Sequence, residues 1–319
     1  MEIISNPTQV EIKKAAQALK DGHLVAFPTE TVYGLGADAT NEKAVSRVYS
    51  VKGRPTDHPL IVHISSINQL SKWAVDIPEY AVKLANEFWP GPMTLILKRS
   101  GIAKDFVTGG QNMVGLRVPS HPSALMLTKE FENLGGFGVA APSANRFGAV
   151  SPTTSDAVLE ELGTFLSNED LLFDGGASEV GIESTIIDCS GVAPNILRPG
   201  IISKEQVEEI CGLQGVDDIS GSKVKTSGLL ISHYSPAGEV VIDGKTSPGD
   251  GFFAMAEFET PTGAIRLGSP ATIEEYAKNL YSVLRLADQK GLNRISVIQP
   301  SGDGLAVAIR DRLSKAAAR

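Results

Sequence analysis

The sequence of 319 residues has little cysteine, no excess of positive charge and no long apolar run. Cys189 and Cys211 lack the spacing of metal-ligand pairs, so we expect reduced structural thiols in a reducing compartment. With a net charge of −8, RNA binding would need a local basic patch, and no long Lys/Arg run is present. No apolar run approaches the roughly 18 residues of a membrane span, and the first residues do not resemble a signal peptide. We therefore expect a cytoplasmic protein that makes no membrane contact.

Several catalytic signatures are also missing. The sequence has no Gly-x4-Gly-Lys-Ser/Thr, no His-Glu-x-x-His and no Gly-x-Ser-x-Gly, which leaves P-loop, metalloprotease and serine hydrolase functions unsupported. No side-chain pattern indicates a direct metal site. Residues 34–39 match the dinucleotide-binding fingerprint only loosely, and Asp57, its candidate ribose ligand, lies in a proline-rich loop rather than at a strand end.

The stretch from Phe27 to Gly36 is the first positive signal. An apolar run over 24–27 predicts a short buried strand, which Pro28 ends because it has no N–H to donate. Hydroxyl, carboxyl and phenol groups follow, and Gly34 and Gly36 permit a tight turn and close approach to a ligand. Such a strand end before a helix commonly binds small anions. The alternative is an ordinary strand-to-helix turn.

A second signal lies about 20 residues further on. Lys52 and Arg54 precede His58, Pro59 and a strand predicted over 59–64. Two prolines stiffen this loop and lower the entropy cost of holding a cation in place. The pair therefore favours a phosphate clamp over the commoner solvated surface pair.

Helices and strands are predicted without regular alternation, which indicates an α/β sheet with parallel and antiparallel pairs. We divide the chain into a catalytic domain (1–211), a linker or lid (212–238) and a smaller α/β domain (239–319). Expected helices lie at about 7–21, 41–53, 78–88, 151–163 and 203–211, and expected strands at 24–27, 59–64, 94–98, 114–118, 138–141, 171–173, 184–188 and 195–198.

The linker and the C-terminal part differ in composition. Residues 212–238 are rich in Gly, Ser, Asp and Lys, apart from a polar aromatic cluster over 232–236. Tyr234 could simply pack the linker down. Beyond it, strands are expected at 240–242, 251–254, 264–267 and 294–298, a long amphipathic helix over 273–287, and a last helix from about 303.

Hydroxyls, amides and cations gather at the predicted strand ends. Such a set suits binding of a triphosphate and a carboxylate, and therefore phosphoryl or nucleotidyl transfer, where positioning and charge stabilisation dominate. Taken singly, each has another explanation: Arg117 could face solvent, His63 could be a core histidine, and Ser184 an ordinary strand residue. The set is Thr31, Lys52, Arg54, His58, His63, Arg117, Ser143, Asn145, Ser151, Ser184 and Arg198.

Seven motifs, in their family order, resemble the YrdC domain over about residues 9–199. The linker and the C-terminal part resemble the two-domain form of the threonylcarbamoyl-AMP synthase family. The resemblance implies a YrdC-like open twisted mixed sheet with flanking helices and a smaller Rossmann-like C-terminal domain. The motifs are Pro28–Gly36, Lys52-Gly-Arg-Pro, Pro59–His63, Ala141-Pro-Ser-Ala-Asn145, Ser151-Pro-Thr, Glu183-Ser-Thr and Arg198-Pro-Gly.

The resemblance also implies a reaction. L-threonine, bicarbonate and ATP would give L-threonylcarbamoyladenylate and pyrophosphate, with Mg²⁺ accompanying ATP. A downstream tRNA threonylcarbamoyl-transferase complex would then modify adenosine 37 of tRNAs that read ANN codons. The sequence leaves direct contact with tRNA open.

By the same resemblance, site roles are implied. Threonine would contact Thr31, His63, Arg117, the Ala141 backbone and Ser184. Lys52 and Arg54 would neutralise phosphate charge during catalysis, and Tyr234 would cover the nucleotide as part of a lid. ATP would contact Lys52, Arg54, His58, Met113, Ser143, Asn145, Ser151, Arg198 and Tyr234.

Two other functions are possible for a chain with these motifs. YrdC-like domains also occur in carbamoyl-transfer proteins of hydrogenase maturation, but those carry acylphosphatase and zinc-finger modules that this chain lacks. A non-catalytic module that binds structured RNA is the second, and the negative net charge argues against it.

Overall fold

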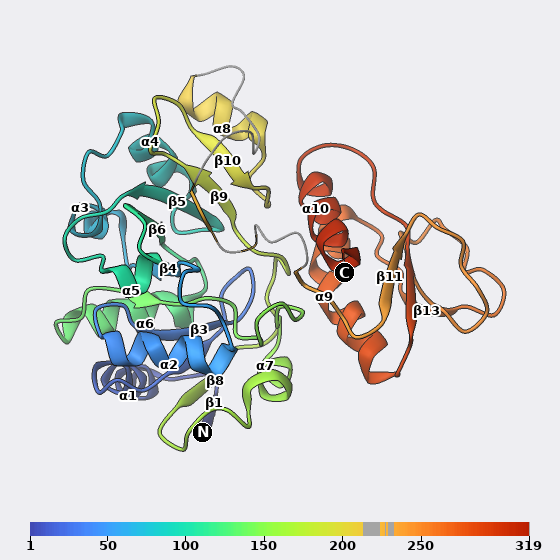
Figure 1. Ribbon diagram of the computed structural model, residues 1–319, viewed down its shortest axis with the longest axis horizontal. Coiled ribbons are helices and arrows are strands. Elements are labelled where there is room, and N and C mark those ends of the chain that lie inside the picture. Colours follow the sequence, from blue (N-terminus) through green and yellow to red (C-terminus); the bar gives the residue numbers. More distant parts are fainter. Residues whose placement is uncertain (213–223, 227, 229–232, 319) are drawn as a thin grey trace.

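The structure, a computed structural model, describes residues 1–212, 224–226, 228 and 233–318. Figure 1 shows a larger N-terminal part and a smaller C-terminal part, with α9 and α10 on the side of the smaller part that faces the larger one. Most of the predicted linker lies outside the described residues.

The N-terminal part alternates short strands and helices. Its helices are α1 (Gln9–Lys20), α2 (Glu42–Lys52), η1 (Ile67–Gln69), α3 (Leu70–Trp73), α4 (Glu79–Phe88), α5 (Asp105–Thr108), α6 (Pro122–Asn133), α7 (Ser155–Leu162) and α8 (Lys204–Cys211). Its strands are β1 (Glu2–Ser5), β2 (Val25–Phe27), β3 (Gly34–Asp38), β4 (Ile61–His63), β5 (Met93–Lys98), β6 (Met113–Arg117), β7 (Val139–Ala140), β8 (Leu171–Asp174), β9 (Thr185–Asp188) and β10 (Asn195–Arg198).

These strands form one ten-stranded sheet in the order β1-β8-β2-β3-β7-β4-β6-β5-β9-β10. Parallel pairs such as β4–β6 and β5–β9 alternate with antiparallel pairs such as β5–β6 and β9–β10. The predicted mixed α/β sheet is therefore confirmed. In this order β7, β4 and β6 are neighbours, and β9 and β10 follow after β5. The ends of these five strands therefore lie in one region of the sheet.

The glycines after Phe27 do not form a turn that leads directly into a helix, so that prediction was wrong. Residues Gly34–Asp38 form β3, which pairs antiparallel with β2. A Cβ atom at Gly36 would lie 2.7 Å from the Phe27 ring and 2.8 Å from Val139. The glycine is thus required by close packing within the sheet, and the loop over 28–33 makes the turn.

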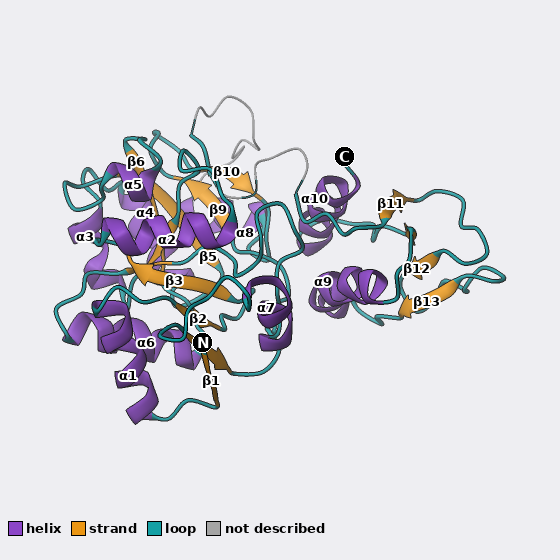
Figure 2. Cartoon of the chain, turned by 60° about the horizontal axis from the view of Figure 1, so that its bottom comes forward, coloured by secondary structure: helices purple, strands orange, loops and turns teal. Residues whose placement is uncertain are grey.

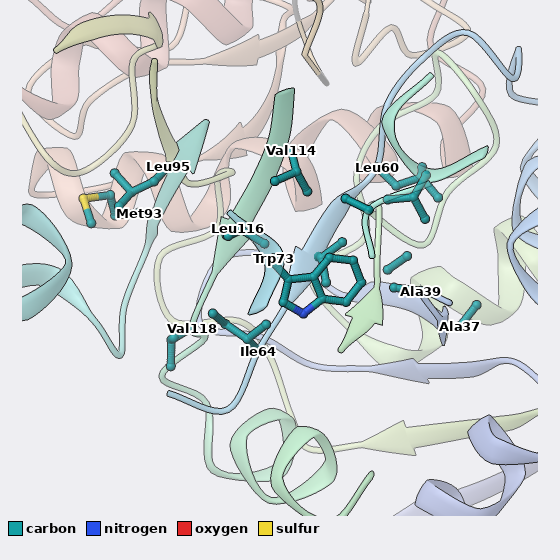
Figure 3. Packing of buried hydrophobic residues seen from close by; sticks show 14 of the residues in the cluster. Ala37, Ala39, Leu60, Ile64, Trp73, Met93, Leu95, Val114, Leu116 and Val118 are labelled. Atoms are coloured by element: carbon teal, nitrogen blue, oxygen red, sulfur yellow. The ribbon is translucent and has the colours of Figure 1, made fainter. Parts of the chain in front are cut away.

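The main core packs against one face of the sheet. Figure 3 shows the Trp73 indole surrounded by Leu60, Ile64 and Leu116. Trp73 is fully buried, and its indole N–H donates to the Phe137 carbonyl at 3.0 Å. This satisfied polar atom lets the large ring lie inside without a desolvation penalty.

A second cluster contains α1, α6 and the strands β2, β7 and β8. Ala124, Leu127 and Phe131 of α6 are buried there beside Ile12 and Leu19 of α1. The sequence analysis did not predict α6 or β1. The signal for α6 was weak, because its N-cap is His121, whose imidazole accepts from the Ser123 N–H, rather than one of the usual capping residues.

The C-terminal part holds β11 (Glu239–Ile242), β12 (Gly251–Phe253), β13 (Ile265–Gly268), α9 (Ile273–Gln289), β14 (Arg294–Val297) and α10 (Leu305–Ala317). Its strands form a parallel sheet in the order β11-β14-β12-β13. Figure 2 shows α9 and α10 between this sheet and the N-terminal part. The predicted smaller α/β domain is confirmed. Among the described residues, none of the helices has the length and apolarity needed to cross a bilayer.

Candidate active site

A cavity lies where the ends of several sheet strands meet the linker. Its walls come from the 28–33 loop, the segment after α2, both ends of β4, the ends of β6 and β10, the start of β3, the segment after β7, the segment before β9, and linker residues 228, 233 and 234. The lining residues are Thr29, Thr31, Val32, Gly34, Arg54, Ile61, His63, Arg117, Ala141, Pro142, Ser143, Glu183, Ser184, Arg198, Gly228, His233 and Tyr234.

All five residues that the sequence assigns to threonine line this cavity. His63 is the last residue of β4, and Arg117 is the last residue of the parallel strand β6. The two residues are paired in the register of these strands, so their side chains lie next to each other at one edge of the sheet. Ala141 follows β7, and Ser184 precedes β9. The Ser184 and Thr94 hydroxyls lie 2.8 Å apart in a buried hydrogen bond.

Arg117 is held by a glutamate that the sequence analysis did not single out. Its Nη2 donates to Glu30 Oε1 at 2.6 Å and to Thr31 Oγ1 at 3.0 Å. Burial alone would raise the pKa of Glu30, yet the Arg117 charge and several hydrogen bonds hold it below its usual value. The Arg117 Nε is buried without a hydrogen-bond partner, so this end of the cavity presents an unused cationic donor. Glu30 lies inside the quoted Pro28–Gly36 motif, which is the signal that could have identified it.

His63 is neutral in this site. Burial, and then the nearby Arg117 charge, lower the pKa of His63 to about 3. Its ring packs edge-on against Phe27, with centroids 6.2 Å apart, and its Nδ1 is buried without a partner. A neutral imidazole with one unpartnered nitrogen suits a polar ligand group rather than ion pairing.

Glu183 carries the densest polar network at the cavity. It accepts from Ser151 Oγ at 2.6 Å, from Tyr281 Oη at 2.8 Å and from Arg312 Nε at 2.8 Å. Burial alone would raise its pKa, but the Arg312 and Arg198 charges and these bonds lower the pKa of Glu183 to about 2. The sequence analysis quoted Glu183 within a motif but gave it no role.

The residues assigned to ATP divide into two groups. Arg54, Ser143, Arg198 and Tyr234 line the cavity. Arg198 donates to the Ser184 carbonyl and hydroxyl, and Arg54 donates to the His58 and Pro59 carbonyls. The remaining ATP-assigned residues do not line the cavity.

Lys52 and Asn145 belong to the second group. The Lys52 ammonium is buried and donates to the Ser143 and Asn145 carbonyls at 2.6 and 2.5 Å. Burial, and then the Arg54 charge, hold the pKa of Lys52 well below its usual range. The Asn145 amide donates to two backbone carbonyls, and its Oδ1 is buried without a partner. In this structure Lys52 shapes the loop beneath the cavity.

His58 and Met113 lie further out. His58 packs edge-on against Phe147, with centroids 5.2 Å apart. Met113 contacts an apolar cluster that also includes Val224 of the linker. Neither side chain reaches the cavity wall in this arrangement.

His233 and Tyr234 form the linker wall. Their ring centroids are 4.0 Å apart, and Tyr234 is buried with a φ of 62°, a conformation that L residues seldom adopt. A Cβ atom at Gly228 would lie 2.6 Å from the Tyr234 hydroxyl. The free space left in the cavity is about 50 Å³, whereas pockets for small organic ligands measure about 300–1,000 Å³.

The charged groups around the cavity do not form a metal centre. Within the described part of the chain, no three His, Cys, Asp or Glu side chains are grouped to hold a metal ion. Three arginines line the cavity together with Glu183, which is paired with Arg312, and the nearby Glu30 is paired with Arg117. The arrangement suits an anionic ligand that brings its own charge into the cavity.

Comparison with known proteins relates both parts of the chain to known domains. The Sua5, YciO and YrdC family model, described as telomere recombination, matches residues 17–200. The model of the threonylcarbamoyl-AMP synthase C-terminal domain matches residues 202–318. Threonylcarbamoyl-AMP synthase of Pyrococcus abyssi is 39% identical, covering 96% of this chain and 94% of that protein. The Bacillus subtilis protein of the same name is 37% identical, covering 99% and 95%.

Solved structures agree. P. abyssi Sua5 complexed with L-threonine superposes with a TM-score of 0.87 at 36% identity, over 99% of this chain and 97% of that one. E. coli YciO, at 22% identity and a TM-score of 0.52 over 62% of this chain, shares the fold alone. Fold and cavity together define a two-part α/β protein whose cavity is lined by three arginines. The chain belongs to the threonylcarbamoyl-AMP synthase family.

Proposed function

We propose that this chain condenses L-threonine, bicarbonate and ATP into L-threonylcarbamoyladenylate and pyrophosphate. The observation that carries the proposal is the convergence of Thr31, His63, Arg117, Ala141 and Ser184 on one cavity, next to Arg54 and Arg198. Family membership supports the same activity, since full-length relatives are named threonylcarbamoyl-AMP synthase. The chain is then a nucleotidyltransferase.

Threonine would occupy the end of the cavity at Arg117. The partnerless Nε of Arg117 would donate to the α-carboxylate, while Glu30 and Thr31 hold the guanidinium through its Nη2. Neutral His63 and the Ser184 hydroxyl would contact the remaining polar groups of the amino acid. Because Arg117 is already oriented, little order would have to be created on binding.

ATP would occupy the end at Arg54 and Arg198. Ser143 and Ser151 would contact the nucleotide, with His58 and Met113 nearer its outer edge, and the Lys52 ammonium has a third donor beyond the two in use. Tyr234 would cover the nucleotide as a lid. Since Tyr234 and His233 wall a cavity of about 50 Å³, both would have to shift when ATP binds.

The chemistry would proceed in two steps. The threonine amino group attacks bicarbonate, and water leaves to give the N-carboxylate. A carboxylate oxygen then attacks the α-phosphorus of ATP, and the bond to pyrophosphate breaks. Arg54 and Lys52 would stabilise the charge that develops on the leaving group. Closure of the linker wall would exclude water from the labile carbamate.

Mg²⁺ would enter with ATP rather than bind a dedicated carboxylate site. Mg²⁺ takes oxygen ligands and is commonly held through substrate phosphates. The buried and partnerless Oδ1 of Asn145 is an oxygen of the required kind, so the residues present fit this ion. When bound, Mg²⁺ would neutralise phosphate charge.

The adenylate is a reactive product, so a second enzyme must consume it. We propose that a tRNA threonylcarbamoyl-transferase complex does so, which places this chain at the first step of tRNA modification. The two free cysteines fit a reducing compartment, and we propose the cytoplasm.

The test is pyrophosphate release from ATP by the full chain with Mg²⁺, comparing L-threonine, L-serine and no amino acid, each with and without bicarbonate. We expect release that depends on both threonine and bicarbonate. Bound ATP with no release in any condition would contradict the proposal and favour a binding function. RNA binding with steep salt dependence would then be the result to look for.

A further inference from the structure

The Glu183 carboxylate lies where the catalytic cavity meets α9 and α10. Two of the side chains that donate to it, Tyr281 of α9 and Arg312 of α10, come from the C-terminal part. Both are buried, as is Glu183. Arg312 Nη2 also donates to the Glu183 carbonyl at 3.4 Å, so this part of the chain grips both the side chain and the backbone.

The same two residues support the linker wall of the cavity. The Tyr281 ring lies 5.5 Å from the Tyr234 ring at an interplanar angle of 30°, and the Arg312 guanidinium lies 5.6 Å from the centre of that ring. Stacking and cation–π contacts of this kind hold an aromatic ring in place. Tyr234 is therefore positioned by α9 and α10 as well as by its own backbone.

A second interdomain ion pair provides a comparison. Arg285 of α9 pairs with Glu161 of α7 at 3.0 Å, and neither residue lines the cavity. That pair fastens the two parts together, and its members also contact backbone groups of Val150 and Arg146 rather than the cavity wall. Glu183, in contrast, lines the cavity, accepts from Ser151 and adjoins Ser184 in the chain. The Arg312 pair therefore includes a residue of the cavity wall, whereas the Arg285 pair does not.

The charge of Arg312 affects the electrostatic potential of the cavity beside Glu183. An unbalanced carboxylate at Glu183 would repel the phosphates of ATP and compete for the nearby Arg198. Arg312 offsets that charge, so the potential at this end of the cavity stays positive. Asp311, at 2.5 Å from Arg312 Nη1, lies on the side of the guanidinium away from the Glu183 bond.

We propose that Tyr281 and Arg312 are positioning residues of the catalytic site, which hold Glu183 and Tyr234 so that Ser151 and Arg198 are set for ATP. On this view the C-terminal part completes the nucleotide end of the cavity. The inference rests on the proposed function, because it assigns that end to ATP.

The first test compares Tyr281→Phe with Tyr276→Phe in the full chain. Both residues are buried tyrosines of α9, and each donates one hydrogen bond, Tyr276 to the Ile298 carbonyl at 3.0 Å. Tyr281→Phe keeps the ring on Tyr234 and removes only the bond to Glu183. We expect it to raise the KM and Kd for ATP about tenfold, with the Kd for threonine and the thermal midpoint matching those of Tyr276→Phe.

A second comparison tests the charge. Arg312→Met should weaken ATP binding more than Arg312→Lys, because lysine retains a cation beside Glu183. In a Glu183→Leu background, Tyr281→Phe should change ATP affinity less than twofold further, because leucine has no acceptor for the Tyr281 hydroxyl and the bond is already lost. If Arg312→Met does not fold, the comparison of Tyr281→Phe with Tyr276→Phe and this double-variant cycle still test the positioning role.

Equal effects of Tyr281→Phe and Tyr276→Phe on ATP, or a parallel loss of both substrates together with the thermal midpoint, would overturn the positioning role. Calorimetric ATP binding is measured apart from turnover. ATP binding by the wild type without pyrophosphate release would therefore overturn the proposed function alone. No ATP binding by the wild type would overturn both.

Discussion

The two ends of the cavity are built differently. At the Arg117 end, Glu30 and Thr31 already hold the guanidinium, and each residue expected to contact threonine lines the wall. At the Arg54 end, Lys52 and Ser151 donate to other protein groups, and His233 and Tyr234 close the wall. With the ligands placed as we propose, the amino-acid end is preorganised, whereas the nucleotide end would have to rearrange for ATP. Such a difference keeps the site closed to water until both substrates are present.

The largest effect should come from the cations of the nucleotide end. We expect Arg54→Ala and Lys52→Ala to lower turnover about 10²–10³-fold, because each removes charge stabilisation of the leaving phosphates. Pyrophosphate release measures this, with Lys83→Ala as an exposed cation control on α4. Melting curves show whether the variants fold, and release at the wild-type rate from either one would refute the clamp.

The next effect concerns the amino-acid end. Arg117→Lys should raise the KM for threonine about 10- to 100-fold and leave the KM for ATP within twofold, since a lysine loses the fork that Glu30 and Thr31 orient. Glu30→Gln should act in the same direction but less strongly. Steady-state kinetics with each substrate varied in turn check this, and a shared rise in both KM values would erase the distinction between the two ends.

A smaller effect is expected at the linker wall. Tyr234→Ala should weaken ATP retention about tenfold, a magnitude typical of losing an aromatic ring that stacks on a base. Tyr234→Phe is the matched control, because it keeps the ring and removes only the hydroxyl. Calorimetry with ATP, and separately with threonine, measures both affinities. Unchanged ATP affinity in Tyr234→Ala would contradict the proposed role of Tyr234 as a lid over the nucleotide.

The remaining effect concerns the stability of the chain against pH rather than its activity. The pKa of His63 is about 3 in the folded chain and about 6.5 when unfolded. The unfolded state therefore binds a proton first as pH falls, and stability is lost from about pH 6.5 towards pH 3. His63→Gln should reduce the loss between pH 7 and pH 5 by about 2 kcal/mol. Urea unfolding at the two pH values measures it, and an unchanged loss would mean that His63 titrates normally.

Local patterns were sufficient for most elements of the fold. The helices expected at 41–53 and 203–211 are present as α2 and α8, because the Asn41 cap and the Ser203 capping box that begin them depend on residues within one helical turn. The sequence predicted a turn where the structure has β3, because glycines usually indicate a turn. Here Gly36 is needed because Phe27 and Val139 pack closely around it, and this packing has no signal in the local sequence. Helix α6 was missed because its cap is atypical and its burial depends on α1.

For the site, the sequence by itself determined which chemical groups are available. The motifs and their order named Thr31, His63, Arg117, Ala141 and Ser184, which lie at or beside strand ends, and the order of the strands in the sheet brings them to one cavity. Roles that depend on contacts between distant segments had no local signal. Glu30 meets Arg117 across 87 positions, and Glu183 meets Arg312 across 129. Only the tertiary structure decided these pairings, because a charge can be buried only where the fold brings its partner to it.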